Sequence, residues 1–514
     1  MYRREVPGQH KLDLPFGVEL RTDNRWVQYA AIMPWEKIDR LYSANFDEPK
    51  GQVAKSSRLA FGALFIQWRL GVTDEETVNQ IQENPSMQYF CGFYSYTTAK
   101  PFDSSLMVHF RKRITEEKMK EITEEAFAAE AKKAIEEESN EDDSDGGGTA
   151  TGGDTGNDGA SHKSTNKGTM LLDATCYPAD IKYPTDIGLL NHARELTERI
   201  IDELHEQIKR PGVEKPRTYR EVARKDYLRF AKKRKPTKQQ IRGAIRQQLQ
   251  YVRRNLGTIN ALIGQGATLD GISEDLEKKL PAIMALYDQQ KQMYDERTHK
   301  VENRIVSIAQ PWLRPIVRGK ANAPVEFGAK VATARIGGFS FMMHTGYENF
   351  PEAQYLQKSA EEYRRIFGFY PKTIIGDKIY GNRDNRNYCK SKGIRLSGPG
   401  LGRKRDDVRE AELEMIYRDS CKRNAIEGDY GTEKRKYGMD RIMAKLEDTT
   451  LTAISVGNFV KNAERLRKKR AIEAAKQASL REMKRFRKHK ASDAVETSGE
   501  ATMEYPEYLL CSLA

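Results

Sequence analysis

Residues 138–168 constrain the fold of this chain more than any other segment, because they cannot form part of a packed core. They read ESNEDDSDGGGTATGGDTGNDGASHKSTNKG, rich in Gly, Asp, Ser and Thr and without apolar periodicity. Such a composition buries too little apolar surface to offset the entropy lost on ordering, so we expect a flexible linker. Together with the acidic residues just before it, the predicted disordered linker spans 134–168 and divides the chain.

The part before the linker, residues 1–133, has the pattern of short helices. Apolar residues recur at helical spacing in 56–71, a capped segment TDEETVNQIQENP follows, and 104–114 carries consecutive cations from Arg111 to Arg113. Short helices joined by tight turns suit a DNA-binding head of the helix-turn-helix type or a dimerisation bundle. A plain helical bundle remains the alternative.

After the linker, short apolar runs alternate with amphipathic segments, which is typical of an α/β layer with a mixed sheet. Buried strands are expected at 168–181, 304–310, 325–336, 339–345, 372–377 and 394–398. Helices are expected at 353–367, 383–393, about 407–423 and about 440–490. A charged helical block at about 188–300 is expected to be an insertion on this sheet.

Positive charge is concentrated in two segments of a chain whose net charge is +13. Residues 224–254 hold twelve Lys or Arg against one acid, and residues 461–490 hold thirteen against three. A solvated helix surface explains either segment alone. Two such segments in one chain favour a polyanionic partner, of which nucleic acid is the commonest.

Cysteine spacing and hydropathy bear on the compartment. The five cysteines are scattered without a CxxC pair, so neither a disulfide framework nor a structural zinc site is expected. The N-terminus has no apolar signal-peptide region, and no run approaches 18 apolar residues. We therefore expect a cytosolic or nucleoid-associated chain with no membrane partner.

Three acidic residues stand out by position. Asp173 lies within the first predicted strand, Asp377 closes the strand at 372–377, and Glu427 lies at the end of a predicted helix. Carboxylates at strand ends can converge on one edge of a sheet. An oxygen-only cluster without His or Cys suits Mg²⁺ or Mn²⁺ rather than zinc. A solvated surface role is the alternative for each, since the chain has 74 acidic residues.

Two cations accompany the third acid. On a continuous helix, Arg423, Glu427 and Lys434 lie within about 40° of one another, since each residue turns the helix by about 100°. Such a face can hold a metal ion and grip a phosphodiester, whereas the plain alternative is an i, i+4 surface pair. Gly428 and Gly431 weaken the helix and could place Lys434 beyond a break.

These residues lie within long blocks. The first acid lies in LLDATCYPADIKYPTDIGLLNHARE, the second in GDKIYGNRDNRNYCKSKGIRLSG and the third in RNAIEGDYGTEKRKYGMDRIMAKLEDT. The N-terminal part contains DNRWVQYAAIMPWEKID, GVTDEETVNQIQENPSMQYFCGF and PFDSSLMVHFRKRI. Together these blocks resemble bacterial insertion-sequence transposases of the IS5 family, within the IS4-like group of DDE enzymes.

The resemblance implies a fold and a catalytic set. The fold is an α/β RNase H-like catalytic core at 169–460, a mixed sheet flanked by helices, with the helical insertion and the all-helical N-terminal domain. A basic C-terminal helix and tail would follow at 461–514. Asp173, Asp377 and Glu427 would be the catalytic triad and would hold two Mg²⁺ ions, for which Mn²⁺ can substitute.

The group's hallmark is Tyr, two residues, Arg, three residues, Glu, six residues, Lys. Arg423, Glu427 and Lys434 match it, while Ser420 stands at the Tyr position and puts that aromatic contact to DNA in doubt. Arg423 and Lys434 would bind DNA phosphates. Tyr380 is a further candidate for the DNA site, although a Tyr there is equally a core residue.

The implied function is metal-dependent strand cleavage followed by 3′-OH strand transfer. The partners would be double-stranded DNA, as terminal inverted repeats and as target, and a second copy of the chain in a homodimer. The setting would be the cytoplasm of a bacterium or archaeon, at the nucleoid. Two alternatives are a catalytically inactive, domesticated transposase that only binds DNA, and an RNase H-like nuclease without strand transfer.

Overall fold

The computed structural model describes residues 2, 12–14, 19–46, 53–144, 166–210, 214–317, 325–398 and 406–496. The chain forms two compact units, Met1–Asn462 and Ala463–Ala514. No helix within these described ranges is long and apolar enough to cross a membrane.

The N-terminal helices form a bundle with an aromatic core. Its helices are α1 (Arg25–Ala30), α2 (Trp35–Ser43), α3 (Ser57–Leu70), α4 (Asp74–Glu83), α5 (Pro85–Phe90) and α6 (Leu106–Arg113). The Phe90 ring lies 5.6 Å from Trp26 and 5.1 Å from Phe65, centroid to centroid. The side chains of Ser56 and Thr73 cap α3 and α4, as their sequence predicts.

Two cations of α6 make contacts within the N-terminal bundle. Arg111 pairs with Asp74 of α4, and the Arg113 guanidinium lies 4.9 Å from the ring centroid of Phe46. Two of the three consecutive cations are therefore used inside the bundle. A DNA-binding role for this segment stays a prediction.

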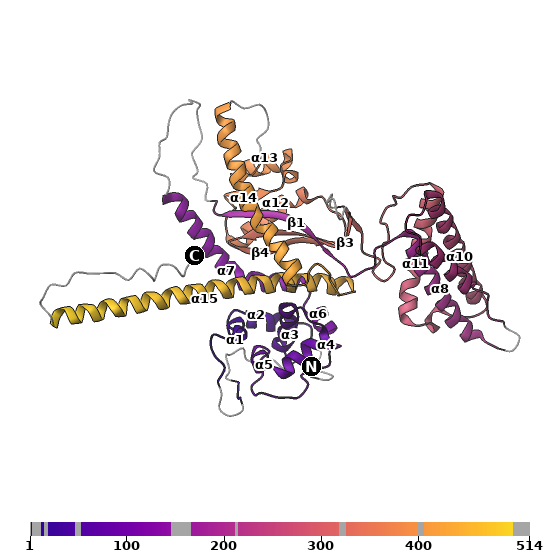
Figure 1. The fold of residues 1–514 in the computed structure, drawn as a ribbon, viewed down its shortest axis with the longest axis horizontal. Coiled ribbons are helices and arrows are strands. Elements are labelled where there is room, and N and C mark those ends of the chain that lie inside the picture. The colour runs from indigo at the N-terminus through magenta and orange to yellow at the C-terminus, as the bar shows by residue number, and fades with distance from the viewer. Residues whose placement is uncertain are drawn as a thin grey trace. The chain divides into compact units, whose positions relative to one another are not determined.

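A mixed sheet forms the centre of the first unit (Figure 1). Its strands are β1 (Thr169–Pro178), β2 (Pro315–Val317), β3 (Val325–Ile336), β4 (Phe339–Gly346), β5 (Thr373–Gly376) and β6 (Arg395–Leu396). They lie in the order β2-β3-β1-β5-β6, and β4 also pairs with β3. β3 runs antiparallel to β1, while β5 is parallel to β1 and β6 to β5.

The last helix before the expected linker packs on the sheet. α7 (Glu116–Ser144) continues through residues 134–144, so the prediction that the linker begins at 134 was wrong. The reason is packing: Ile135 is fully buried, and Thr169 of β1 donates a 2.8 Å hydrogen bond to Glu138. A Cβ at Gly337 would lie 2.5 Å from the Ala131 carbonyl oxygen, so this turn needs glycine. Residues 145–165 of the expected linker lie outside the described ranges.

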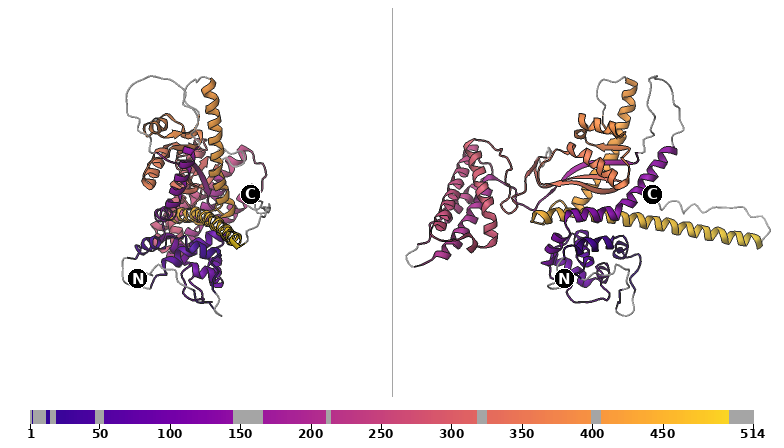
Figure 2. Two further views of the ribbon diagram at one scale, coloured as in Figure 1. Left: turned by 90° about the vertical axis from the view of Figure 1, so that its left-hand side faces the viewer. Right: turned by 180° about the vertical axis from the view of Figure 1, so that it is seen from behind.

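The insertion between β1 and β2 has a hydrophobic core of its own. It consists of α8 (Asp186–Ile208), α9 (Arg220–Ala231), α10 (Lys238–Gly264) and α11 (Glu274–Asp295), with α8, α10 and α11 side by side (Figures 1 and 2). Leu196, Val252 and Leu286 belong to its buried core. Residues 304–310, expected as a strand, are irregular, because Ile305 and Ile308 pack into this helical core instead of the sheet.

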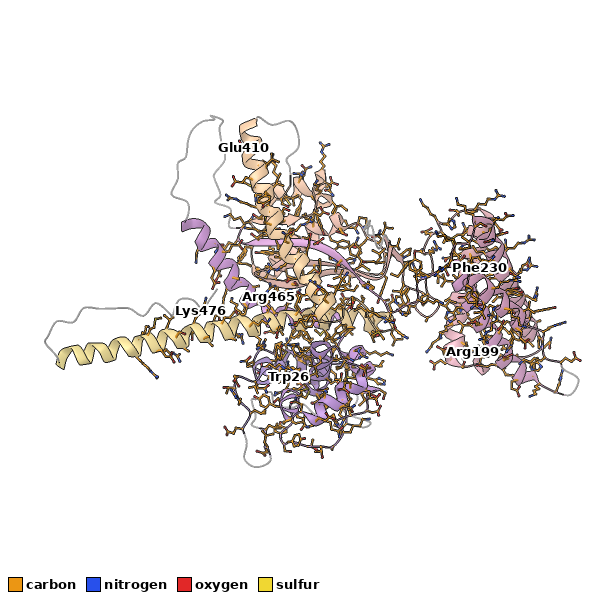
Figure 3. The ribbon with its side chains drawn as sticks, in the orientation of Figure 1. Trp26, Arg199, Phe230, Glu410, Arg465 and Lys476 are labelled. Carbon is orange, nitrogen blue, oxygen red and sulfur yellow. The ribbon has the colours of Figure 1, made fainter. Side chains whose placement is uncertain are left out.

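The remaining helices follow the predicted order. They are α12 (Leu356–Phe367), α13 (Arg383–Ser391), α14 (Asp406–Lys436) and α15 (Glu447–Glu496). α14 passes unbroken through Gly428 and Gly431, so Lys434 shares its helix with Glu427. α15 continues into the second unit, where Figure 3 shows the side chains of Arg465 and Lys476 along the helix.

We predict that Glu362 of α12, which pairs with Arg365 of its own helix and with Lys120 of α7, stabilises the fold less at acid pH. A hydrogen bond from Arg365 and the charge of Lys120 lower the pKa of Glu362 from 4.5 to about 2, against the opposing effect of burial. A lowered carboxylate pKa stabilises the fold above pH about 4.5, and the gain is lost as pH falls through about 2. Glu362→Gln should therefore lower the free energy of unfolding at pH 6. The difference from the unaltered chain should shrink progressively toward pH 2.5.

Urea unfolding of both proteins across this range measures the effect. The exposed neighbour Glu117→Gln is the matched control and should show no such pH-dependent difference. A Glu362→Gln deficit that stays constant from pH 6 to pH 2.5 would contradict the assignment.

Candidate active site

β1 presents Asp173 on the face of the sheet that α14 covers. Side chains alternate along a strand, so Leu171, Asp173 and Tyr177 share a face. Leu171 packs against Ile426 of α14, and the Tyr177 hydroxyl donates a hydrogen bond to Glu433 of α14. Asp173 lies between these two contacts.

Asp377 follows β5 directly. In the parallel β1–β5 pair Leu172 lies opposite Gly376, so Asp173 and Asp377 are the next residues of the two neighbouring chain segments. β5 ends at this level, whereas β1 continues to Pro178. Asp377 therefore lies at the end of its strand and Asp173 lies within β1, as the sequence predicts.

Arg423 of α14 connects two of the three acids. Its Nη2 lies 2.8 Å from Oε1 of Glu427, and its Nη1 lies 3.2 Å from Oδ1 of Asp377. The side chains of Asp377 and Glu427 are 56% and 51% exposed, so both carboxylates reach solvent. An ordinary i, i+4 surface pair would involve α14 alone, whereas this guanidinium joins α14 to the end of β5.

The electrostatics of Arg423 bring in the third acid. Partial burial lowers the pKa of Arg423, but the hydrogen bond to Glu427 and the charges of Asp377, Glu427 and Asp173 raise it by more. The fields of all three predicted acids therefore act on one guanidinium. That the three acids form one catalytic site stays a prediction.

Tyr380 lies beneath the site. It ends the short 3-10 helix η4 (Lys378–Tyr380), which the Asp377 side chain caps. Its side chain is 1% exposed, and its hydroxyl has no hydrogen-bond partner within the described part of the chain. Burial and the charges of Glu352, Asp173 and Asp377 hold its pKa well above 10. This burial agrees with the core alternative and does not support the expected direct contact with a DNA phosphate.

The remaining motif positions lie along α14. Lys434 is partly buried, with its Nζ 5.8 Å from the ring centroid of Tyr177. Ser420 is exposed, and seven residues along a helix place it within about 20° of Glu427. Because serine has no ring, this position cannot make the aromatic contact that the hallmark Tyr implies.

The opposite side of α14 carries a buried polar network that no sequence pattern predicted. Lys461 of α15 lies 2.6 Å from Oε1 of Glu433, and that oxygen also accepts a 3.1 Å hydrogen bond from Asn458. Arg335 of β3 pairs with Asp429 at 3.0 Å. These contacts fix the rotation of α14 about its axis.

A hydrogen bond also connects α14 to the backbone of Asp173 on β1. The Tyr430 hydroxyl donates a 3.0 Å hydrogen bond to the backbone carbonyl of Asp173. The available signal was helical spacing: Ile426, Tyr430 and Glu433 recur at i, i+4 and i+7, the period of a buried stripe. Spacing alone does not show that the buried Glu433 pairs with Lys461, which lies on the next helix about thirty residues later.

The donor chemistry of the site fits a hard divalent cation. The three acids supply oxygen ligands only, which Mg²⁺ and Mn²⁺ prefer in proteins. Within the described ranges, however, no three His, Cys, Asp or Glu residues are gathered closely enough to form a metal-binding group. Arg423 instead lies between Asp377 and Glu427.

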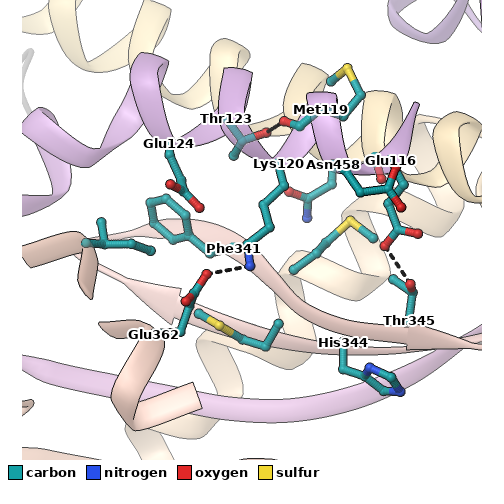
Figure 4. A pocket seen from close by; sticks show the side chains of 15 residues that line it. Glu116, Met119, Lys120, Thr123, Glu124, Phe341, His344, Thr345, Glu362 and Asn458 are labelled. Carbon is teal, nitrogen blue, oxygen red and sulfur yellow. Dashed lines mark hydrogen bonds and ion pairs between the residues drawn. The ribbon is translucent and has the colours of Figure 1, made fainter. Parts of the chain in front are cut away.

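A separate cavity of about 230 Å³ lies where α7, β4, α12 and the start of α15 meet (Figure 4). Lys120 pairs with Glu362 across it, and Thr345 donates a hydrogen bond of 2.5 Å to Glu116. None of the three predicted catalytic acids lines it. The cavity therefore belongs to the packing of α7, apart from the candidate active site.

The fold is that of an α/β protein with a mixed sheet flanked by helices, in which Arg423 joins Asp377 and Glu427 at the end of β5. Two family models match the chain: one described as "Transposase DDE domain" at residues 374–463, and one described as "Transposase domain (DUF772)" at residues 17–113. The first range includes Asp377, Arg423 and Glu427, whereas Asp173 precedes it. The two matches support an insertion-sequence transposase, with DNA as its partner.

The chain is 27% identical over 203 residues to "Uncharacterized protein ORF8 in nfe locus" of Rhizobium meliloti, which covers 40% of this chain and 82% of that protein. No solved structure matches the chain.

We predict that the buried pair Lys461–Glu433 is a large contributor to stability. Lys461→Met leaves Glu433, which is 0% exposed, as a buried carboxylate without its cation. Removing one partner of a buried pair costs about 3–5 kcal/mol. The double variant Lys461→Met/Glu433→Gln should lose less than the single variant, because no buried charge is left over.

Chemical denaturation followed by circular dichroism measures these differences. Lys468→Met is the matched control, since Lys468 is 60% exposed and its ion pair with Glu464 spans 3.8 Å. Exposed pairs contribute about 0–1 kcal/mol. Equal destabilisation by Lys461→Met and Lys468→Met would show that the network does not hold α14.

Proposed function

We propose that this chain is an insertion-sequence transposase of the IS5 family, with an RNase H-like DDE core that cuts transposon ends and joins them to target DNA. The observation that carries the proposal is the Arg423 guanidinium, which holds Asp377 and Glu427 together within the field of Asp173. The sheet order, with β3 antiparallel and β5 parallel to β1, supports the RNase H-like core.

The proposed reaction has two displacements at phosphorus. In the first, a water oxygen attacks the phosphorus at the transposon end, and the bond from phosphorus to the 3′ oxygen breaks, leaving a 3′-OH and a 5′-phosphate. In the second, that 3′-OH attacks a target phosphodiester, forms a new ester and releases a target 3′-OH. The proposed partners are double-stranded DNA, as ends and as target, and a second copy of the chain that pairs the two ends.

The residues of the site have distinct proposed roles. Asp173, Asp377 and Glu427 would hold two Mg²⁺ ions, or Mn²⁺ in their place, and such ions activate a nucleophile and stabilise the leaving oxygen. Arg423 and Lys434 would bind phosphate oxygens next to the cleaved bond. Tyr380 would support the segment after β5 from below, as its burial indicates.

Asp377→Ala should abolish Mg²⁺-dependent nicking of transposon-end DNA while keeping end binding. The substitution removes a ligand that is 56% exposed, so the fold should survive. Nicking is read on denaturing gels and binding by mobility shift. Asp384→Ala, an exposed acid in the first turn of α13, is the matched control and should nick at the wild-type rate.

The same assay separates the alternatives. Nicking by Asp377→Ala at the wild-type rate would make the triad assignment wrong. An unaltered chain that binds ends but does not nick them would be a DNA-binding protein without catalysis. A chain that nicks, but does not join a pre-cut end bearing a 3′-OH to target DNA, would be a nuclease.

A further inference from the structure

Cations are gathered at the corner between α9 and α10 of the insertion. Five of them, which we call the α9–α10 corner, are Lys232, Lys233, Arg234, Lys235 and Lys238. All five side chains are exposed. Within the described ranges, none of them forms an ion pair with an acidic side chain.

The corner is held in place by the residues on either side of it. Phe230, labelled in Figure 3, packs against the core of the insertion just before the corner begins. After it, Thr237 and Gln240 form a reciprocal capping box that fixes the start of α10. The five cations therefore project from a backbone anchored at both ends.

The acid nearest to the corner does not neutralise it. Asp226 of α9 pairs with Arg229 and accepts hydrogen bonds from Gln247 and Tyr251 of α10. These contacts use the carboxylate to join the two helices. α10 itself has no Asp or Glu over its 27 residues.

On α11 of the same insertion, the lysines are neutralised by acidic partners. α11 carries three lysines, and each forms an i, i+4 ion pair: Lys278 with Glu274, Lys279 with Asp275 and Lys291 with Asp295. Positive charge is therefore compensated on α11 and left uncompensated at the α9–α10 corner. A surface of uncompensated, anchored cations favours a partner with dense negative charge.

We infer that the α9–α10 corner binds the phosphate backbone of double-stranded DNA, independently of sequence and through residues outside the candidate active site. The choice of DNA rests on the proposed function. DNA carries one negative charge per about 1.7 Å of helix axis, which suits closely spaced cations. The insertion is thereby a second DNA contact, which holds the duplex without reading its bases.

The test compares two triple variants of the full chain with the same change in charge. Lys232→Gln/Lys233→Gln/Lys235→Gln removes three cations from the corner. Lys278→Gln/Lys279→Gln/Lys291→Gln removes three paired cations from α11. Circular dichroism checks that both variants fold. Fluorescence anisotropy measures binding to a duplex of unrelated sequence, in EDTA, from about 50 to about 200 mM salt.

The slope of log K against log salt should fall in magnitude by about one for each phosphate-binding cation removed, thus by about three for the corner variant. The α11 variant should keep the wild-type slope. Equal slopes for both variants, or an equal weakening of binding in both, would overturn the inference. Equally tight, equally corner-dependent binding of an RNA duplex of the same length would overturn the choice of DNA.

This binding assay is independent of catalysis. If the unaltered chain fails to nick transposon ends, the proposed function fails, while the difference in slope between the two variants remains measurable. If nicking proceeds and the corner variant keeps the wild-type slope, the corner is not a DNA contact and the proposed function stands.

Discussion

The ion pair between Lys461 and Glu433 is the contact on which the geometry of the candidate active site depends. It joins the start of α15 to the buried side of α14, and Tyr177 of β1 donates a hydrogen bond to the same carboxylate. A buried carboxylate without partners is strongly unfavourable, so α14 cannot rotate away from these donors. Fixing that rotation decides which side of α14 faces solvent at the end of β5.

The two sides of α14 place its acids in different surroundings. Asp429 and Glu433 face inward, where they have paired cations, whereas Glu427 faces the end of β5 and is half exposed. Arg423 lies on that outer side and offsets the repulsion between Glu427 and Asp377. Acids of one helix thus differ in exposure and in partners, although their side chains have the same chemistry.

Much of the fold could be predicted from local pattern, and the failures had physical causes. Alternating apolar runs predicted β1, β3, β4 and β5, and the i, i+4 spacing predicted the Arg423–Glu427 pair. Residues 304–310 were apolar enough for a strand, but they pack into the insertion. Helix α7 continues past residue 134 because Ile135 has a buried place against the core, and composition does not show such a partner.

For the candidate site, too, local sequence patterns predicted some residues and missed those that depend on distant partners. Position in the sequence led to Asp173, Asp377 and Glu427, because strands and helical spacing are local properties. The buried network beneath α14 depends on residues far apart in the chain, such as Arg335 with Asp429, and no local period reports such a pairing.

The insertion is compatible with this site because it has a separate core. It leaves the sheet after β1 and returns before β2, so β1 and β3 keep an unbroken nine-residue register on which Asp173 lies. A helical module that stabilises itself can vary its surface charge without disturbing that register. The unpaired cations of its α9–α10 corner therefore need no structural role in the sheet, and the paired lysines of α11 show that compensation was available to the same module. Uncompensated charge at an anchored corner is best explained by a partner outside the chain.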